Sequence, residues 1–196
     1  MCPTGSRLGS RLFGKSGQEV PVVGLGSEGI LRTYGEYEKA QSAVKGAESQ
    51  GITYFDSAKA YAGSEGYYGQ FWEEHPDIWA NIFQTSKSAS RDKDGALKDL
   101  ENTLETMGLD HLDLWQIHDL RSKSDLREIA GPGGALESFR EAKDAGKVRL
   151  IGVTGHHDPS ILTCAVENWD VDSVLMPVNP LEGVLWWFSR HNFAGS

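Results

Sequence analysis

The sequence lacks any long hydrophobic run and is poor in cysteine, and each shortage excludes a class of protein. No apolar run is long enough to span a bilayer. The opening stretch, MCPTGSRLGSRLFGK, contains no apolar core of signal-peptide length. The two cysteines, Cys2 and Cys164, lie far apart and form no metal-ligand spacing. We therefore expect a cytoplasmic protein with reduced cysteines and no membrane partner.

Positive charge is also scarce. The chain carries 19 lysines and arginines against 28 aspartates and glutamates, which gives a formal net charge of -9. Because nucleic acids favour a basic face, this balance argues against a nucleic-acid partner. A phosphate-bearing ligand would need basic side chains or helix N-termini placed locally. The 196 residues suffice for one domain with a full hydrophobic core, so we expect a single domain over residues 1–196.

Glycine, by contrast, is abundant, and in three places it separates an amphipathic stretch from an apolar run. These places read AVKGAESQG-ITYF, LENTLETMG-LDHLDLWQIH and FREAKDAG-KVRLIGV. Glycine accepts the left-handed conformation that ends a helix, so Gly51, Gly108 and Gly146 are predicted helix stops. Apolar residues at three- and four-residue steps predict a core-facing stripe on these helices, as in Leu97, Leu100, Leu104 and Met107.

Six short apolar runs alternate with the predicted helices. They read VPVVGLG, ITYFDSA, IFQTSK, LDLWQIH, VRLIGVTG and SVLMPVNP. Such alternation predicts βαβ units and a parallel sheet that is covered on at least one face. Ahead of them, RLFGKSGQEVPVV predicts a small hairpin that turns at Lys15–Gly17. The longest predicted connection is Leu120–Gly134, after the fourth run.

Most of the predicted strands end in a polar or small residue. In parallel α/β folds, ligands bind outside the carboxyl ends of the strands. A single polar residue there has an ordinary explanation as a strand end that meets solvent, whereas several at one rim favour a site. We therefore expect a site built from Asp56, Lys87, His118, Thr154 and Asn179.

The stretch GLGSEG, from Gly24 to Gly29, matches the dinucleotide-binding pattern G-x-G-x-x-G directly after a predicted strand. In a Rossmann unit the helix opens within these glycines, so that its N-terminus meets the pyrophosphate. Here ILRTYGEYEKA intervenes, and the helical pattern starts near Glu36. We therefore interpret the glycines as a loop that passes close to a ligand, and not as a Rossmann fingerprint.

Several motifs together resemble the aldo-keto reductase family. FDSAKAYAGSEGYYG is similar to the family's D-x-A-x-x-Y signature with its helix-opening segment. IFQTSK resembles the strand that carries the family lysine, LDHLDLWQIHD the strand with the family histidine, and AGKVRLIGVTGH the strand after it. The order and spacing agree over about residues 10–182, and residues 183–196 diverge. The resemblance implies a (β/α)8 TIM barrel, incomplete here, with about six of its eight strands and an N-terminal β-hairpin.

The resemblance also implies a reaction, in which hydride passes from a reduced nicotinamide to an aldehyde or ketone. The family positions fall on Asp56, Tyr61, Lys87 and His118 of this sequence. Tyr61 would donate the proton, Lys87 would lower its pKa, and Asp56 would pair with Lys87. His118 would orient or polarise the carbonyl while neutral.

The implied cofactor is NADP(H), and the implied partner is a small carbonyl substrate. The cofactor residues carried over from the family lie after the first, second, fifth and sixth predicted strands. The adjacent histidines His156 and His157 could suggest a metal, but no third ligand lies at a suitable spacing, so we expect none. The expected cofactor contacts are Gly26, Ser27, Asp56, Thr154, Gly155, His156 and Asn179.

Beyond MPVNPLEGVL the family pattern stops, and the chain closes with WWFSRHNFAGS. Family members continue with two more strand–helix units, so open strand edges and homo-oligomer formation are expected. A second hypothesis therefore stands beside the reductase, namely a non-catalytic truncated barrel that acts as an interaction module or inactive remnant. The segments Ile30–Tyr34 and Leu120–Gly134 are expected to line the substrate pocket.

Overall fold

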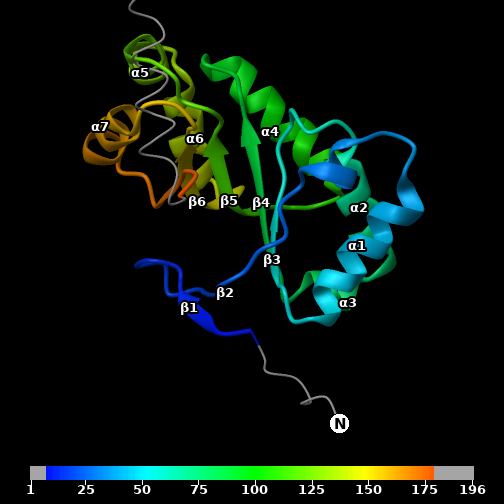
Figure 1. The fold of residues 1–196 in the computed structure, drawn as a ribbon. Coiled ribbons are helices and arrows are strands. Elements are labelled where there is room, and N and C mark those ends of the chain that lie inside the picture. Colours follow the sequence, from blue (N-terminus) through cyan, green and yellow to red (C-terminus); the bar gives the residue numbers. More distant parts are fainter. Residues whose placement is uncertain (1–7, 179–196) are drawn as a thin grey trace, which may run out of the picture.

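The computed structural model describes residues 8–178, which form an N-terminal hairpin followed by one parallel sheet flanked by helices (Figure 1). The sheet has the strand order β3-β4-β5-β6-β7, so each strand pairs with the next along the chain. β1 and β2 pair antiparallel and form the expected hairpin. The strands are β1 (Ser10–Leu12), β2 (Glu19–Pro21), β3 (Tyr54–Asp56), β4 (Phe83–Ser88), β5 (Leu112–Ile117), β6 (Val148–Thr154) and β7 (Ser173–Leu175).

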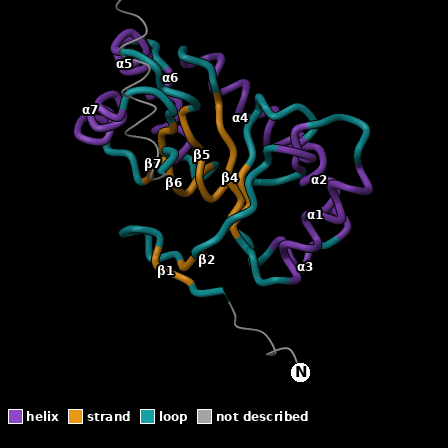
Figure 2. Tube along the Cα trace, viewed as in Figure 1, coloured by secondary structure: helices purple, strands orange, loops and turns teal. Residues whose placement is uncertain are grey.

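Helices alternate with the strands and flank the sheet, as the purple and orange segments of Figure 2 show. This is part of the wall of a β/α barrel, so the expectation of an incomplete barrel is confirmed. Among residues 8–178, no helix has the length and apolar character needed to cross a membrane. The helices are η1 (Gly29–Arg32), α1 (Tyr37–Ser49), α2 (Ser64–Glu74), α3 (Pro76–Trp79), α4 (Lys93–Met107), α5 (Lys123–Ala130), α6 (Ala135–Asp144) and α7 (Pro159–Trp169).

The main core lies between the sheet and its helices. Alternate side chains of each strand point to this layer, since successive residues of a strand face opposite ways. Trp115 of β5, for example, stacks on Phe139 of α6 with ring centroids 3.6 Å apart. Leu100 and Met107 of α4 are fully buried here, so the predicted stripe on that helix faces the core.

The opposite face of the sheet is closed at one end by the hairpin. Val20 of β2 packs against Phe83, Leu114 and Leu150, which lie on three neighbouring strands. Lys87 shares the face of Phe83, since the two are four residues apart in β4. The hairpin therefore covers this face at the amino ends of the strands, and polar groups occupy the same face at the carboxyl ends.

The predicted helix stops are confirmed. Gly51, Gly108 and Gly146 have φ values of 82°, 66° and 72° and follow the ends of α1, α4 and α6. Gly108 caps α4 directly, and its N–H donates back to Glu105. These left-handed conformations favour glycine, because a side chain would clash with the neighbouring backbone.

The first strand was predicted over VPVVGLG, but the part that pairs with the parallel sheet is much shorter. Only Leu25 pairs with the sheet, through a single parallel bridge to Phe55 of β3. Val22 and Val23 are 58% and 46% exposed, so they gain little by joining a ladder. The sheet therefore has five strands and one bridging residue in place of six strands.

The glycines of GLGSEG do not open a long helix. The short η1 begins at the last of them, Gly29, and α1 starts at Tyr37, close to the predicted start. Leu25 exchanges two backbone hydrogen bonds with β3, each 2.9 Å long. A Cβ on Gly24 would lie only 2.8 Å from the Tyr54 ring, so this glycine permits the close approach.

The predicted long connection Leu120–Gly134 contains an eight-residue helix, α5. Ser122 and Asp125 form a reciprocal capping box at its start, in which each side chain accepts from the other's backbone N–H. The sequence prediction missed this signal because the helix is short and its apolar face is small. Ile129 is its one fully buried residue.

Candidate active site

Asp56 and Lys87 form a buried ion pair at the carboxyl ends of β3 and β4. Lys87 Nζ lies 2.6 Å from Asp56 Oδ2 and 2.6 Å from the Ser57 carbonyl oxygen. The lysine is only 2% exposed, and burial lowers its pKa, against the opposing effect of Asp56. Asp56 thus compensates a charge that would otherwise be costly to bury.

The other carboxylate oxygen of Asp56 is also held. Thr85 of β4 donates its hydroxyl to Asp56 Oδ1 over 2.7 Å, and Gln116 of β5 approaches the same oxygen at 3.5 Å. The register pairs Asp56 with Thr85 and Lys87 with Gln116, so the polar residues of three strands meet at one end of the sheet. The carboxylate is therefore fixed in direction before any ligand arrives.

Tyr61 lies above this pair in the loop between β3 and α2. Its ring centroid is 4.8 Å from Lys87 Nζ, and the ring meets His118 edge to face at 5.5 Å. The loop is shaped by a turn in which the Tyr61 N–H donates to Ala58, and by Ala62 with a φ of 42°. The sequence prediction that Asp56, Tyr61, Lys87 and His118 lie together in space therefore agrees with the geometry.

The pKa of Tyr61 differs from the expectation. It is raised to about 12, mainly by burial and less by Asp56 and Glu28, with Arg32 acting in the opposite direction. The net shift is therefore upward, whereas the sequence led us to expect a lowered pKa. Lys87 lies 4.8 Å from the ring centroid, but burial and the Asp56 carboxylate that pairs with Lys87 both disfavour the phenolate.

His118 follows β5 and is positioned through its backbone, whose N–H donates to the Ser88 carbonyl over 2.8 Å. Burial first, and the nearby Lys87 ammonium second, lower its pKa to about 4. The imidazole is therefore neutral at pH 7, with one N–H donor and one acceptor nitrogen. This agrees with the expected neutral hydrogen-bond donor.

The expected cofactor contacts on the described strands lie at the same rim, but two of their hydroxyls are already engaged. Ser27 is buried, donates to the Asp56 carbonyl and lies within hydrogen-bond distance of the Tyr68 hydroxyl, at 3.2 Å. Thr154 is buried and accepts from the Asp119 N–H over 2.8 Å. His156 is exposed, and Gly155 packs tightly against Leu120 and Leu162, whereas Asn179 lies outside the described residues.

The structure adds residues that the sequence did not single out. A pocket of about 540 Å³ opens above Tyr61 and His118. Within it Arg91 donates to the carbonyls of His118 and Asp119 over 2.8 and 2.9 Å, which orders the loop after β5. No motif marks Arg91, because its partners are backbone atoms nearly thirty residues away in the chain. The lining consists of Glu28, Arg32, Ala60, Tyr61, Ala89, Arg91, His118, Asp119, Arg121, Asp125 and His156.

The expectation that Ile30–Tyr34 and Leu120–Gly134 line the pocket is supported by Arg32, Arg121 and Asp125, which all belong to the lining. In residues 8–178, no three histidine, cysteine or acidic side chains are close enough to hold a metal ion. His157 faces Asp119 instead, with 3.6 Å between His157 Nε2 and Asp119 Oδ1.

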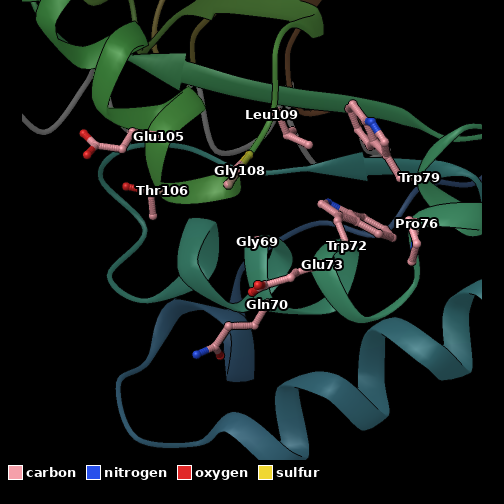
Figure 3. Close-up of a pocket in the computed structure, with 11 residues that line it drawn as sticks. Gly69, Gln70, Trp72, Glu73, Pro76, Trp79, Glu105, Thr106, Gly108 and Leu109 are labelled. Atoms are coloured by element: carbon pink, nitrogen blue, oxygen red, sulfur yellow. The ribbon is translucent and has the colours of Figure 1, made fainter.

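A second pocket, of about 500 Å³, lies between α2, α3 and the end of α4 (Figure 3). Trp72 and Trp79 line one part of it, and Thr106 and Gly108 line another. It contains none of the residues that the sequence assigned to the site.

The parallel sheet, its flanking helices and a polar site at the strand ends define a protein of the β/α-barrel class. The family model for the aldo/keto reductase family matches residues 22–185. The chain therefore belongs to the aldo/keto reductase family.

Relatives and solved structures agree with this assignment. The chain is 28% identical to an aldo-keto reductase of Mycobacterium avium, over 88% of this chain and 60% of that protein. It is 26% identical to L-galactose dehydrogenase of Arabidopsis thaliana, over 76% of this chain and 49% of that protein. The chain thus spans about half to 60% of the length of these relatives.

Two solved structures show the fold. An aldo-keto reductase of Bacillus halodurans in its holo form superposes with a TM-score of 0.74 at 19% identity, over 94% of this chain and 63% of that one. An aldo-keto reductase of Klebsiella pneumoniae in complex with NADPH gives a TM-score of 0.69 at 22% identity, over 91% and 63%. At these identities the structural match supports the barrel architecture alone.

Proposed function

We propose that this protein reduces an aldehyde or ketone to an alcohol by hydride transfer from NADP(H), with Tyr61 as the general acid. The observation that carries the proposal is the buried Asp56–Lys87 pair beneath the Tyr61 ring, with His118 against the ring edge. An ion pair with a purely structural role would not require a phenol and a neutral imidazole that face the same pocket. A carbonyl reduction needs both, because negative charge develops on the carbonyl oxygen.

Each residue has a distinct part in the proposed reaction. Tyr61 keeps its proton at neutral pH, since its pKa is about 12, and can give it to the developing alkoxide. Lys87 stabilises the phenolate that remains, with Asp56 holding the ammonium in place. Neutral His118 donates one hydrogen bond to the carbonyl oxygen and orients it.

The described rim residues fit a nicotinamide cofactor. Gln116 Oε1, near the carboxyl end of β5, is a buried acceptor without a partner among the described residues and could accept from the nicotinamide amide. The residues proposed to hold NADP(H) are Gly26, Ser27, Asp56, Thr154, Gly155 and His156, with Asn179 beyond the described part. When bound, the reduced nicotinamide supplies the hydride.

Titration with NADPH tests cofactor binding. The chain has six tryptophans, so binding is expected to quench protein fluorescence. Saturable quenching supports the proposal. An absence of quenching at high NADPH would favour the non-catalytic module.

The Tyr61→Phe variant tests the role of the phenol. It removes the proton donor and keeps the ring that packs on Lys87 and His118, so NADPH quenching should persist. Reduction of an aromatic aldehyde, followed by NADPH absorbance, should fall by at least about 100-fold. The control is Tyr34→Phe, which removes a phenol from a residue 79% exposed and outside the pocket lining. Equal rates for Tyr61→Phe and the parent would refute the assignment.

A further inference from the structure

The pocket above Tyr61 has a lining that favours a small polar ligand. Apart from Ala60 and Ala89, each lining residue carries a charge, an imidazole or the Tyr61 phenol. Little apolar surface is therefore available to bind a hydrophobic aldehyde. Charged groups must therefore select among carbonyl compounds. The lining contains three arginines, each of which could bind an anionic group of a substrate.

The three arginines differ in how many of their guanidinium nitrogens are already engaged. Arg91 donates to two backbone carbonyls, and Arg121 directs Nε and Nη2 at Asp119 Oδ2. Arg32 makes both of its bonds to Glu28 through Nη1 alone, at 2.8 and 3.0 Å. Its Nε and Nη2 make no hydrogen bond within residues 8–178. Arg32 is thus the arginine of the lining with two nitrogens, on one edge of its guanidinium, left for a ligand.

Arg32 also lies in the right place relative to the chemistry. Its Cζ is 5.2 Å from the centroid of the Tyr61 ring, at the end of η1. A guanidinium binds a carboxylate or phosphate with two parallel hydrogen bonds. A group held there would lie over the ring of the proposed acid, so the rest of the same molecule can reach the Tyr61 hydroxyl.

The acidic residues of the lining do not prevent this. Glu28, Asp119 and Asp125 each lie within 4 Å of an arginine of the same lining, at 2.8, 2.6 and 3.7 Å. Three arginines thus offset three carboxylates, and the pocket is close to neutral in a chain whose net charge is -9. The mouth of the site is therefore less repulsive to an anion than the rest of the molecule.

We infer that the substrate is a small carbonyl compound bearing an anionic group, and that Arg32 binds this group while the carbonyl meets Tyr61 and His118. That this ligand is reduced rests on the proposed reductase function. That an anionic ligand binds here rests only on Arg32 and the pocket.

The first test is binding to the intact protein without cofactor. The probes are 4-(hydroxymethyl)benzoate and its methyl ester, titrated by calorimetry. The carboxylate should bind at least about tenfold more tightly, because it forms charge-assisted hydrogen bonds that the ester cannot form. Arg32→Gln should abolish this preference, and Arg32→Lys should restore part of it. Arg127→Gln, the same change on an exposed arginine outside the pocket, should leave it intact.

The second test is reduction of 4-carboxybenzaldehyde and methyl 4-formylbenzoate with NADPH. The ratio of the two kcat/KM values should exceed about ten in the parent and approach one in Arg32→Gln. Using a ratio cancels any general loss of folding or of Tyr61 function. Equal values for acid and ester in the parent would overturn the inference and leave the reductase intact. Carboxylate binding through Arg32 without reduction of either aldehyde would instead overturn the proposed function.

Discussion

At the scale of single residues, the site depends on one buried charge and its compensation. Lys87 is 2% exposed, and its ammonium touches Asp56 and the Ser57 carbonyl. Such a pair adds little net stability by itself, but removing one partner leaves an uncompensated charge in the interior. The geometry of the site and the stability of the fold are therefore linked at this point.

The Asp56→Asn variant should show this link. It keeps the shape of the side chain and removes the charge that compensates Lys87, so the free energy of unfolding should fall by about 3 kcal/mol. Urea denaturation followed by fluorescence measures the change. Asp110→Asn is the control, because Asp110 is 87% exposed where it pairs with His111 and should shift stability by less than about 0.5 kcal/mol. Equal small effects would show that Lys87 is not held by Asp56.

His118 gives a pH dependence whose sign follows from its lowered pKa. The pKa is about 4 in the folded protein against an ordinary value of 6.5, so the unfolded chain binds the proton more readily. The contribution of His118 is complete above pH 6.5 and is lost as the pH falls toward 4. The thermal midpoint of the parent should therefore drop more between pH 7 and pH 5 than that of His118→Gln. Parallel drops in both proteins would contradict the lowered pKa.

Some properties of the site residues can be predicted from the sequence, and others cannot. The D-x-A-x-x-Y spacing and the strand-end lysine and histidine were enough to predict that Asp56, Tyr61, Lys87 and His118 meet. The pKa of Tyr61 was not predictable, because it depends on how deeply the ring is buried and on the acidic groups that the fold places near it, such as Asp56. Arg32 and Arg91 were missed as individual residues, since their roles depend on contacts between distant loops.

At the scale of elements, α2 and α4 pack through a glycine. A Cβ on Gly69 of α2 would press into the Thr106 carbonyl oxygen and lie 2.9 Å from Met107 Cα, both near the end of α4. Figure 3 shows Gly69 and Gly108 in the region where these helices meet. Because the obstructing atoms are backbone, a side chain at this position would force the two helices apart.

Two glycine-to-alanine changes in α2 should therefore have opposite signs. Gly69→Ala should destabilise the protein by about 1–3 kcal/mol through overpacking. Gly66→Ala, in the same helix with no atom within 4 Å of the added Cβ, should stabilise it by about 0.5–1 kcal/mol through helix propensity. Chemical denaturation of the two variants measures both. A stabilising Gly69→Ala would mean that α2 and α4 are not in close contact.

The elements that sequence reasoning placed well are those with strong local signals. The ends of α1, α4 and α6 were predicted from glycines that adopt positive φ. The two errors are the strand VPVVGLG and the missing α5. In both places the local sequence pattern does not decide the structure. VPVVGLG has strand-like composition, but only Leu25 finds a partner on β3. The short α5 has a capping box but little apolar surface, so its pattern is weak.

At the scale of the whole molecule, the sheet brings together residues that are far apart in the chain. Asp56 lies in β3 and Lys87 in β4, and His118 directly follows β5; the parallel pairing of these three strands aligns their carboxyl ends. The hairpin closes the amino end of the same face through Val20. The site is thus bounded by packed apolar side chains on one side and opens to the pocket on the other.

The sequence by itself determined the family, the alternation of strands and helices and the identity of the four central residues, because these depend on local spacing and residue type. Only the tertiary structure decided that Lys87 is buried against Asp56, that the pKa of Tyr61 is raised and that Arg32 lies over its ring. These properties depend on distances and burial between segments that the chain brings together only on folding. A pKa or a binding pocket is a property of that assembled environment, and no single stretch of sequence contains it.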